Sequence, residues 1–192
     1  GGTQRTITVS TTDEDGHFVL ATQSLTVNNV APTLALAGVA AISEGDSYSL
    51  NIVGSDVAGA ADPLSYSINW NDGSAVQVLT AEQLAAVSGN VTHTFADDAD
   101  GLENETLRTI SVTVNDGDGG ITQQNQLVTV NNVAPTAAVT GADTVPEASV
   151  YTLSVSAVVD PGADTRTGYS IAWGDGATSN FTPAEWLAAG GS

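Results

Sequence analysis

The chain has 192 residues, of which 22 are acidic and three are basic, so its formal net charge is −19. All three basic residues are arginines, and the chain contains no lysine, cysteine or methionine. Such a polyanion cannot neutralise a run of phosphates, which argues against nucleic-acid binding, and the missing residue types exclude disulfides, thiolate metal sites and lysine chemistry. Apolar residues make up 41% of the chain, enough for packed cores, and no stretch reaches the ~18–20 apolar residues of a membrane helix.

Short strands separated by turn signals are predicted along the chain. Segments rich in Ser, Tyr, Leu, Ile and Val that end at Gly, Asn or Asp are typical of strands. In chain order, strands are predicted at 47–52, 64–70, 75–79, 91–95, 106–114 and 121–130. In the fifth of these, four apolar residues are set against polar neighbours: Leu107, Ile110, Val112 and Val114.

Two short helices are also expected. The first covers 81–87, with Thr80 as its N-cap. The second follows Thr182, where Pro183 at the first helical position and Glu185 two residues later complete a capping box.

The sequence repeats with an offset of 103 residues. Asn28-Asn29-Val30-Ala31-Pro32-Thr33 recurs as Asn131-Asn132-Val133-Ala134-Pro135-Thr136, and 16 of the 29 residues in 5–33 are identical to their partners in 108–136. We therefore divide the chain into the C-terminal part of one repeat (1–30), a complete repeat (31–133) and the N-terminal part of a further repeat (134–192).

Six to eight short strands in about 100 residues predict an antiparallel two-sheet sandwich. Trp70, Tyr66 and Phe95 are the large apolar side chains available to fill the space between the sheets. A platform on which a sugar stacks is the alternative role for these aromatics, but a single aromatic residue per strand does not make a platform.

Three motifs resemble those of PKD (polycystic kidney disease) domains. Ile171-Ala172-Trp173-Gly174-Asp175-Gly176 is similar to the family's W-x-x-G-D-G stretch, His93-Thr94-Phe95 to its H-x-Y/F strand, and 112–120 to its V-x-V-x-D-x-D-G-G hairpin. The complete repeat departs from the pattern at Asn71, where the family usually has Gly. The resemblance implies an all-β chain of immunoglobulin-like antiparallel β-sandwich repeats, found in secreted and surface proteins of bacteria and archaea.

Calcium at the repeat junctions is a further expectation. In cadherin-like and PKD-like arrays an early acid, a linker Asn and the hairpin Asp-x-Asp meet between domains, and carboxylates are suitable ligands for Ca²⁺. Here the first junction would join Asp13, Asp15 and Asn28 or Asn29 with Glu44 or Asp56, and the second Asp116, Asp118 and Asn131 or Asn132 with Glu147 or Asp160. The alternative is that Asp-x-Asp-Gly is an ordinary turn in which Asp makes local hydrogen bonds.

A second acidic group, Asp97, Asp98 and Asp100 with Glu103 and Glu105, is either another cation site or a solvated loop. The two histidines, His17 and His93, have no counterparts in the other copies, and no nucleophile motif accompanies them. We therefore expect no catalytic activity.

The sequence favours a structural segment of a large extracellular or cell-surface protein, such as an adhesin stalk, whose repeats neighbour one another. Two alternatives remain. The chain is a module that binds a carbohydrate or protein ligand, or it is a fibre subunit whose partial repeats, 1–30 and 134–192, complete each other head to tail between copies. For those partial repeats the simpler interpretation is an excerpt of a longer array.

Overall fold

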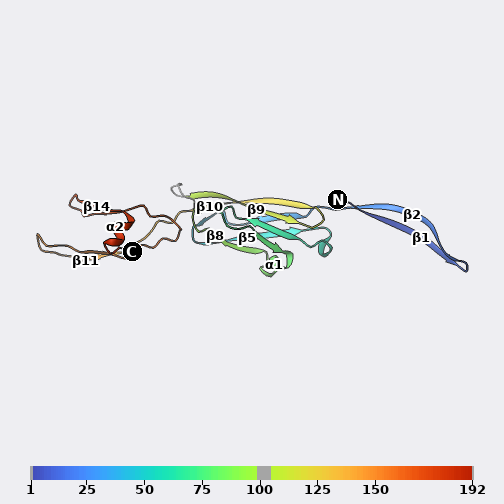
Figure 1. Cartoon of the computed structure of the whole chain (residues 1–192), viewed down its shortest axis with the longest axis horizontal. Helices are drawn as coiled ribbons and strands as arrows, with labels where there is room; N and C mark the ends of the chain where they lie inside the picture. The colour runs from blue at the N-terminus through green and yellow to red at the C-terminus, as the bar shows by residue number, and fades with distance from the viewer. Residues whose placement is uncertain (1, 99–104, 192) are drawn as a thin grey trace. The chain divides into compact units, whose positions relative to one another are not determined.

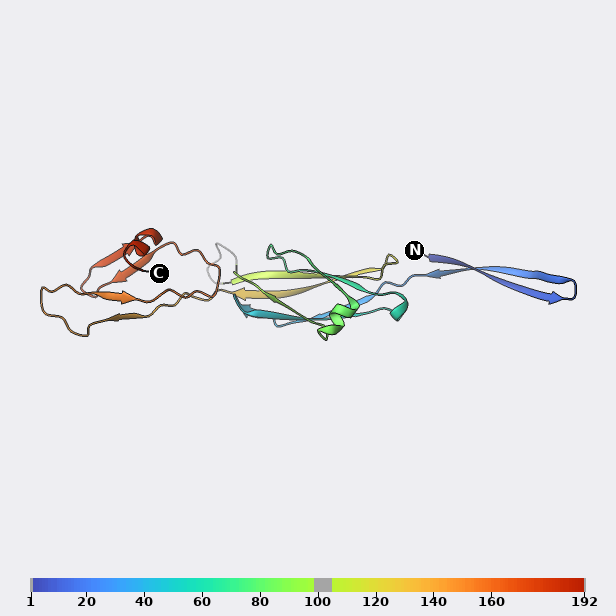
Figure 2. The ribbon, with the colours of Figure 1, turned by 60° about the horizontal axis from the view of Figure 1, so that its bottom comes forward.

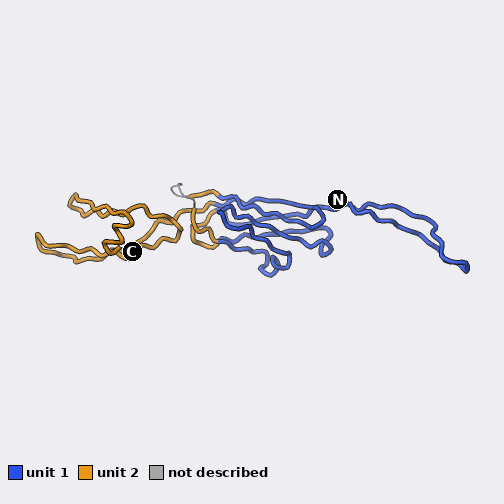
Figure 3. Tube along the Cα trace, in the orientation of Figure 1, with its two compact units in different colours: residues 1–40, 48–93, 108–128 blue, residues 41–47, 94–107, 129–192 orange. Residues whose placement is uncertain are grey.

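The computed structural model describes residues 2–98 and 105–191. The protein is all-β, with strands in several sheets and, within the described ranges, two short α-helices. The chain divides into two compact units (Figure 3), one formed by Gly1–Ala40, Tyr48–His93 and Arg108–Val128 and the other by Ala41–Ser47, Thr94–Leu107 and Thr129–Ser192. Both units take segments from 31–133, so the compact units and the sequence repeats have different boundaries.

A long antiparallel ribbon opens the chain (Figure 1). Strands β1 (Gly2–Asp13) and β2 (Gly16–Asn28) pair from Gly2 opposite Asn28 to Asp13 opposite Gly16, with a register shift after Val9. Apart from Gly16, its residues are exposed, the apolar ones included. The ribbon therefore has backbone pairing but no core of its own.

The segment 33–131 forms two sheets (Figure 2). The five-stranded sheet has the order β4-β10-β9-β6-β7, and its strands are Ala41–Ser43, Ile121–Asn131, Glu105–Asn115, Ser65–Asn69 and Gln77–Thr80. The three-stranded sheet has the order β3-β5-β8, with strands Thr33–Ala37, Ser47–Ser55 and Asn90–Thr94. Strands β4 and β10 are parallel, whereas β3 with β5 and β6 with β7 and β9 are antiparallel.

Alternate residues of these strands form the buried core. The apolar core side chains of this segment are Tyr48, Leu50, Ile52, Tyr66, Ile68, Trp70, Leu84, Val91, Phe95, Ile110, Val112, Val114, Val128 and Val130. The rings of Tyr48 and Trp70 meet edge to face, with centroids 6.4 Å apart. Burial of Trp70 confirms its predicted role in the core, and the contact joins β5 of the three-stranded sheet to the residue that directly follows β6 of the five-stranded sheet.

The prediction that Leu107 belongs to the buried apolar face of its strand is wrong. Leu107 is exposed, whereas Ile110, Val112 and Val114 are buried. Successive strand side chains point to opposite faces, so a residue three positions before Ile110 lies on the other face of β9.

Both predicted helices are present and both begin with a capping box. Helix α1 (Ala81–Ala86) is capped by Thr80, whose side chain and backbone exchange hydrogen bonds with Gln83. Helix α2 (Pro183–Ala188) is capped in the same way by Thr182 and Glu185. These caps supply partners for backbone N–H groups that a helix cannot pair internally.

Residues 134–191 contain shorter elements. β11 (Val139–Gly141) pairs with β12 (Leu153–Val155), and β13 (Tyr169–Ala172) pairs with β14 (Thr178–Phe181). The buried side chain here is Trp186 of α2, which the sequence analysis did not single out. It stacks on Tyr169 with centroids 4.5 Å apart and meets Phe181 edge to face.

Candidate metal centre

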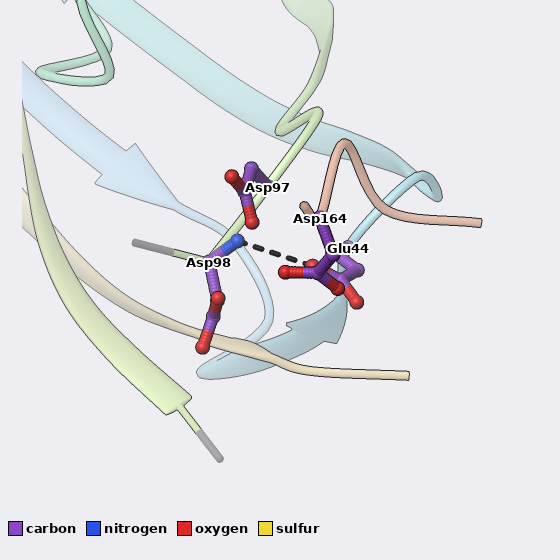
Figure 4. Close-up of side chains that lie close together, drawn as sticks. All are labelled: Glu44, Asp97, Asp98 and Asp164. Atoms are coloured by element: carbon purple, nitrogen blue, oxygen red, sulfur yellow. Dashed lines mark hydrogen bonds between the residues drawn. The ribbon is translucent and has the colours of Figure 1, made fainter. Parts of the chain in front are cut away.

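Four carboxylates form the most concentrated acidic site within the described ranges. Glu44, Asp97, Asp98 and Asp164 each offer one oxygen, and these oxygens lie within 4.8 Å of one another (Figure 4). We call this group the carboxylate cluster. Glu44 and Asp98 are buried, and Asp97 and Asp164 are partly buried. The cluster lies within the second compact unit and combines residues far apart in sequence.

Glu44 is placed by backbone pairing at the end of β4. Its N–H donates to the Asn131 carbonyl at 2.9 Å, and the next N–H, from Gly45, donates to the Phe95 carbonyl at 2.8 Å. Each carboxylate oxygen then accepts a backbone N–H: Oε1 from Val133 at 2.7 Å and Oε2 from Asp98 at 3.2 Å. One buried side chain thus ties the linker after β10 to the segment after β8.

The loop before β13 supplies the remaining member of the cluster. It is joined to the segment after β8 by a hydrogen bond of 2.9 Å from the Ala163 N–H to the Ala96 carbonyl. Gly162 lies so close to Glu44 that a Cβ atom there would be 2.5 Å from the carboxyl carbon. The absence of a side chain at Gly162 therefore lets this loop bring Asp164 against Glu44.

The electrostatics of the cluster favour a bound cation. Burial raises the pKa of Asp164, and the negative charges of Glu44, Asp97, Asp160 and Asp98 raise it further. Asp160 is close enough to contribute, and both of its carboxylate oxygens are buried without a hydrogen-bond partner. A divalent cation would relieve this repulsion without protonation.

A second acidic group lies in the first compact unit and is built differently. Asp116 is buried, and its Oδ2 accepts a hydrogen bond of 2.8 Å from the Nδ2 of Asn29, while Oδ1 accepts the N–H groups of Asp118 and Gly120 at 2.8 and 2.9 Å. The bond from Asn29, opposed by burial and assisted by the backbone donors, lowers the pKa of Asp116. These donors make Asp116 a turn residue that also holds the linker.

Two further acids accompany Asp116. Burial and the negative charges of Asp118, Asp56 and Asp116 raise the pKa of Asp62. Asp56 accepts the Ala58 N–H with Oδ1 at 2.8 Å, and its Oδ2 is buried without a hydrogen-bond partner. The loop 56–62 of the complete repeat thus carries an acid at each end, as the loop 160–164 does in the next repeat.

The predicted ligands are grouped differently in the structure. Asn29 contacts Asp116 rather than the acids of its own hairpin, where Asp13 accepts the Asp15 N–H at 2.9 Å. Asp13 and Asp15 are exposed, as are Asn132 and Glu147. Both Asp-x-Asp hairpins make the local hydrogen bonds expected of an ordinary turn.

Sequence reasoning found Glu44 and Asp160 but combined them with other acids. Asp97 and Asp98 were named as a possible second site, and Asp164 was missed; of the same acidic run, Asp100 and Glu103 lie outside the described residues. The available signal for Asp164 was the likeness of 160–164 to 56–62, since both loops place Gly-Ala between two aspartates.

The histidine in the predicted strand motif has a packing role. His93 stacks on Trp70, with ring centroids 4.5 Å apart, and its Nε2 lies 2.6 Å from Oδ2 of Asp72. His17, the other histidine, lies 3.2 Å from the Thr12 hydroxyl in the exposed ribbon.

No known protein family matches this chain, and no curated protein matches it significantly. None of the helices in the described ranges is long and apolar enough to cross a membrane.

Proposed function

We propose that this chain is a structural, non-catalytic segment of an extracellular or cell-surface protein, built of tandem PKD-like repeats that act as spacers. The observation that carries the proposal is the position of Glu44. This buried carboxylate belongs to the complete repeat, accepts the N–H of Val133 in the following linker, and lies against Gly162 of the next repeat. Spacer repeats need this kind of fixed connection.

The arrangement of core residues supports an immunoglobulin-like sandwich as the repeating unit. The buried residues alternate along β5, β6 and β9. Inner faces of two sheets enclose a core in such folds, with outward-facing residues alternating between them. Trp70, which directly follows β6, is buried in this core.

The linkers favour limited movement between repeats. Pro32 and Pro135 each fix φ and hold the preceding alanine in an extended conformation. The linker before the complete repeat is joined to it by the bond from Asn29 to Asp116, and the linker after it by the bond from Val133 to Glu44. Each linker is thus bonded to a buried side chain.

Calcium is the cation that best fits the carboxylate cluster. The ligands are all carboxylate oxygens, which suit a hard cation, and Ca²⁺ takes six to eight oxygens in flexible geometry. Glu44, Asp97, Asp98 and Asp164 would hold the ion, with Asp160 beside them. The ion would offset the repulsion among these acids and add a connection between the complete repeat and the loop of the next.

Thermal unfolding of the chain in EDTA and in millimolar calcium tests this proposal. A ligand that binds only the folded state stabilises it by RT ln(1 + [L]/Kd), about 2.7 kcal/mol at a 100-fold excess over Kd. We expect calcium to raise the melting temperature by several degrees. Glu44→Gln combined with Asp98→Asn should abolish the rise.

Glu14→Gln is the matched control, because Glu14 is an exposed acid in the β1–β2 turn. It should retain the full calcium response. Equal melting temperatures in EDTA and calcium would remove the cation from the proposal. The spacer role is tested separately by measuring the distance between spin labels attached at Ser74→Cys and Ser179→Cys. The chain has no cysteine of its own, so only these two positions are labelled. A broad distribution of label-to-label distances both in EDTA and in calcium would contradict the spacer role.

A further inference from the structure

A groove of ≈ 650 Å³ lies on the complete repeat. Its lining comes from the end of β5, the loop 56–64, Tyr66, and helix α1 with the turn that follows it. We call it the α1 groove. All of these residues fall within 52–89, one continuous stretch of the first compact unit, and a volume of this size is typical of ligand sites.

The α1 groove combines apolar and acidic surface. Tyr66 and Leu84 are buried side chains that contribute to its apolar lining. Its acids are Asp56 and Asp62, at the two ends of a loop, and Glu82, in the first turn of α1. The described residues that line it include no basic side chain. Burial and the negative charges of neighbouring carboxylates raise the pKa of Asp62, so a cationic group in this groove is attracted.

The end of β5 presents backbone groups to the α1 groove. The Ile52 N–H donates to the Gly89 carbonyl, next to β8, at 2.8 Å. On the other side of β5, the Ser55 carbonyl accepts a hydrogen bond of 3.1 Å from the Thr33 hydroxyl of β3. The backbone groups of successive strand residues point to opposite neighbours. The N–H and C=O of Gly54 therefore face the same side as those of Ile52.

β8 does not continue along this part of β5. It begins at Asn90, whose side chain accepts a hydrogen bond of 3.1 Å from Asn51, and the chain before it turns at Ser88, where φ is 53°. Gly54 lines the groove together with Ser88 and Gly89. Within the described part of the chain, no strand therefore pairs with Gly54 on this side of β5.

We propose that the α1 groove binds an extended basic segment of a partner protein, which pairs as an added antiparallel strand with β5 at Gly54. The Gly54 N–H donates to a carbonyl of this segment, and the Gly54 carbonyl accepts an N–H in return. Main-chain hydrogen bonds give strand addition its affinity, and alternate side chains give it specificity. Successive side chains of the added strand point to opposite faces, so apolar residues directed towards Leu84 alternate with basic residues that attract Asp62 and Glu82.

Charge complementarity identifies the occupant as basic. The chain has a net charge of −19 and no lysine, so a stretch of similar composition would be repelled by the acids of the groove. A segment rich in lysine or arginine is attracted instead. The inference goes beyond the spacer function, since it assigns a partner and a surface. The α1 groove shares no residue with the carboxylate cluster, so calcium binding is not part of it.

Fluorescence anisotropy with a labelled peptide is the first test. The probe is Gly-Lys-Val-Lys-Val-Lys-Gly, titrated with the 192-residue chain at physiological salt, and we expect saturable binding. Asp62→Asn combined with Glu82→Gln should weaken this binding several-fold. Asp46→Asn combined with Glu105→Gln is the matched control, because it removes the same charge from exposed acids that do not line the groove. Absence of binding, or equal weakening by the two double variants, overturns the proposal.

Amide hydrogen exchange of the unmodified chain is the second test. Binding of the peptide should slow exchange of the Gly54 amide and leave that of the Val53 amide, which faces β3, unchanged. A peptide N-methylated at both valines lacks the N–H groups that face β5 and should not bind. A peptide N-methylated at two lysines, whose N–H groups point away from β5, should still bind. Unchanged exchange at Gly54, or equal binding of the two methylated peptides, overturns the added strand.

Discussion

Truncating the same tryptophan in two copies of one motif tests whether the complete repeat alone has a closed core. Trp70 and Trp173 are repeat equivalents, and 2% and 41% of their surfaces are exposed. Trp70 also contacts the rings of Tyr48 and His93. Replacing a buried tryptophan by alanine costs ~3–5 kcal/mol, so Trp70→Ala should destabilise its repeat by about that amount.

The expected cost at Trp173 is smaller. The exposed fractions differ by 39%, and a tryptophan side chain buries up to about 250 Å², so Trp173 buries roughly 100 Å² less than Trp70. At about 25 cal/mol per Å² this difference amounts to ~2.5 kcal/mol. We therefore expect the destabilisation by Trp173→Ala to be about 2 kcal/mol smaller than that by Trp70→Ala.

Native-state amide hydrogen exchange measures the two effects separately, because it reports opening free energies residue by residue. The exchange rates of the β6 amides report the effect of Trp70→Ala, and those of the β13 amides report the effect of Trp173→Ala. Equal losses at the two sites would refute the reasoning, because burial would then not distinguish the closed core from the open one.

Two further predictions concern the complete repeat and its junction. Burial acts to raise the pKa of Asp72, but hydrogen bonds from Ser74 and His93 outweigh it and lower the pKa from 3.8 to about 2. The stability that this carboxylate contributes is therefore present above pH 3.8 and lost as the pH falls towards 2. Asp72→Asn should lower the melting temperature at pH 7 and make the melting temperature less dependent on pH between pH 4 and 2. Gly45 has φ = 76°, and a Cβ there would lie 2.8 Å from the Pro161 carbonyl oxygen. Gly45→Ala should therefore cost more in thermal unfolding than Gly117→Ala, whose φ is 84° and whose Cβ would meet open space; equal costs would mean that the approach to Pro161 is unimportant.

Much of the local structure follows from the sequence alone. The six predicted strands and two predicted helices are present, because alternation and capping residues act within a few positions. Local backbone conformation also explains why asparagine is tolerated at position 71, where the PKD-like motif usually has glycine. Asn71 and its equivalent Gly174 both have positive φ, 56° and 83°, and asparagine adopts this conformation more readily than most residues.

Only the tertiary structure decided which acids meet. Glu44 lies more than 50 residues from Asp98 in sequence and farther still from Asp164, and no local pattern specifies contacts at that separation. The predicted grouping relied on the hairpin Asp-x-Asp motif, in which Oδ1 of Asp13 and Oδ1 of Asp116 accept backbone N–H groups of their own turns.

The burial of equivalent residues was likewise decided by their surroundings. Trp70 and Trp173 belong to the same motif, and Val112 and Val9 to the same strand pattern, yet one member of each pair is buried and the other exposed. The sequence determined the repeat, the strand periodicity and the turns, because these depend on neighbouring residues. Burial depends on whether a second sheet or strand pair covers the apolar face, and that is a property of the three-dimensional arrangement.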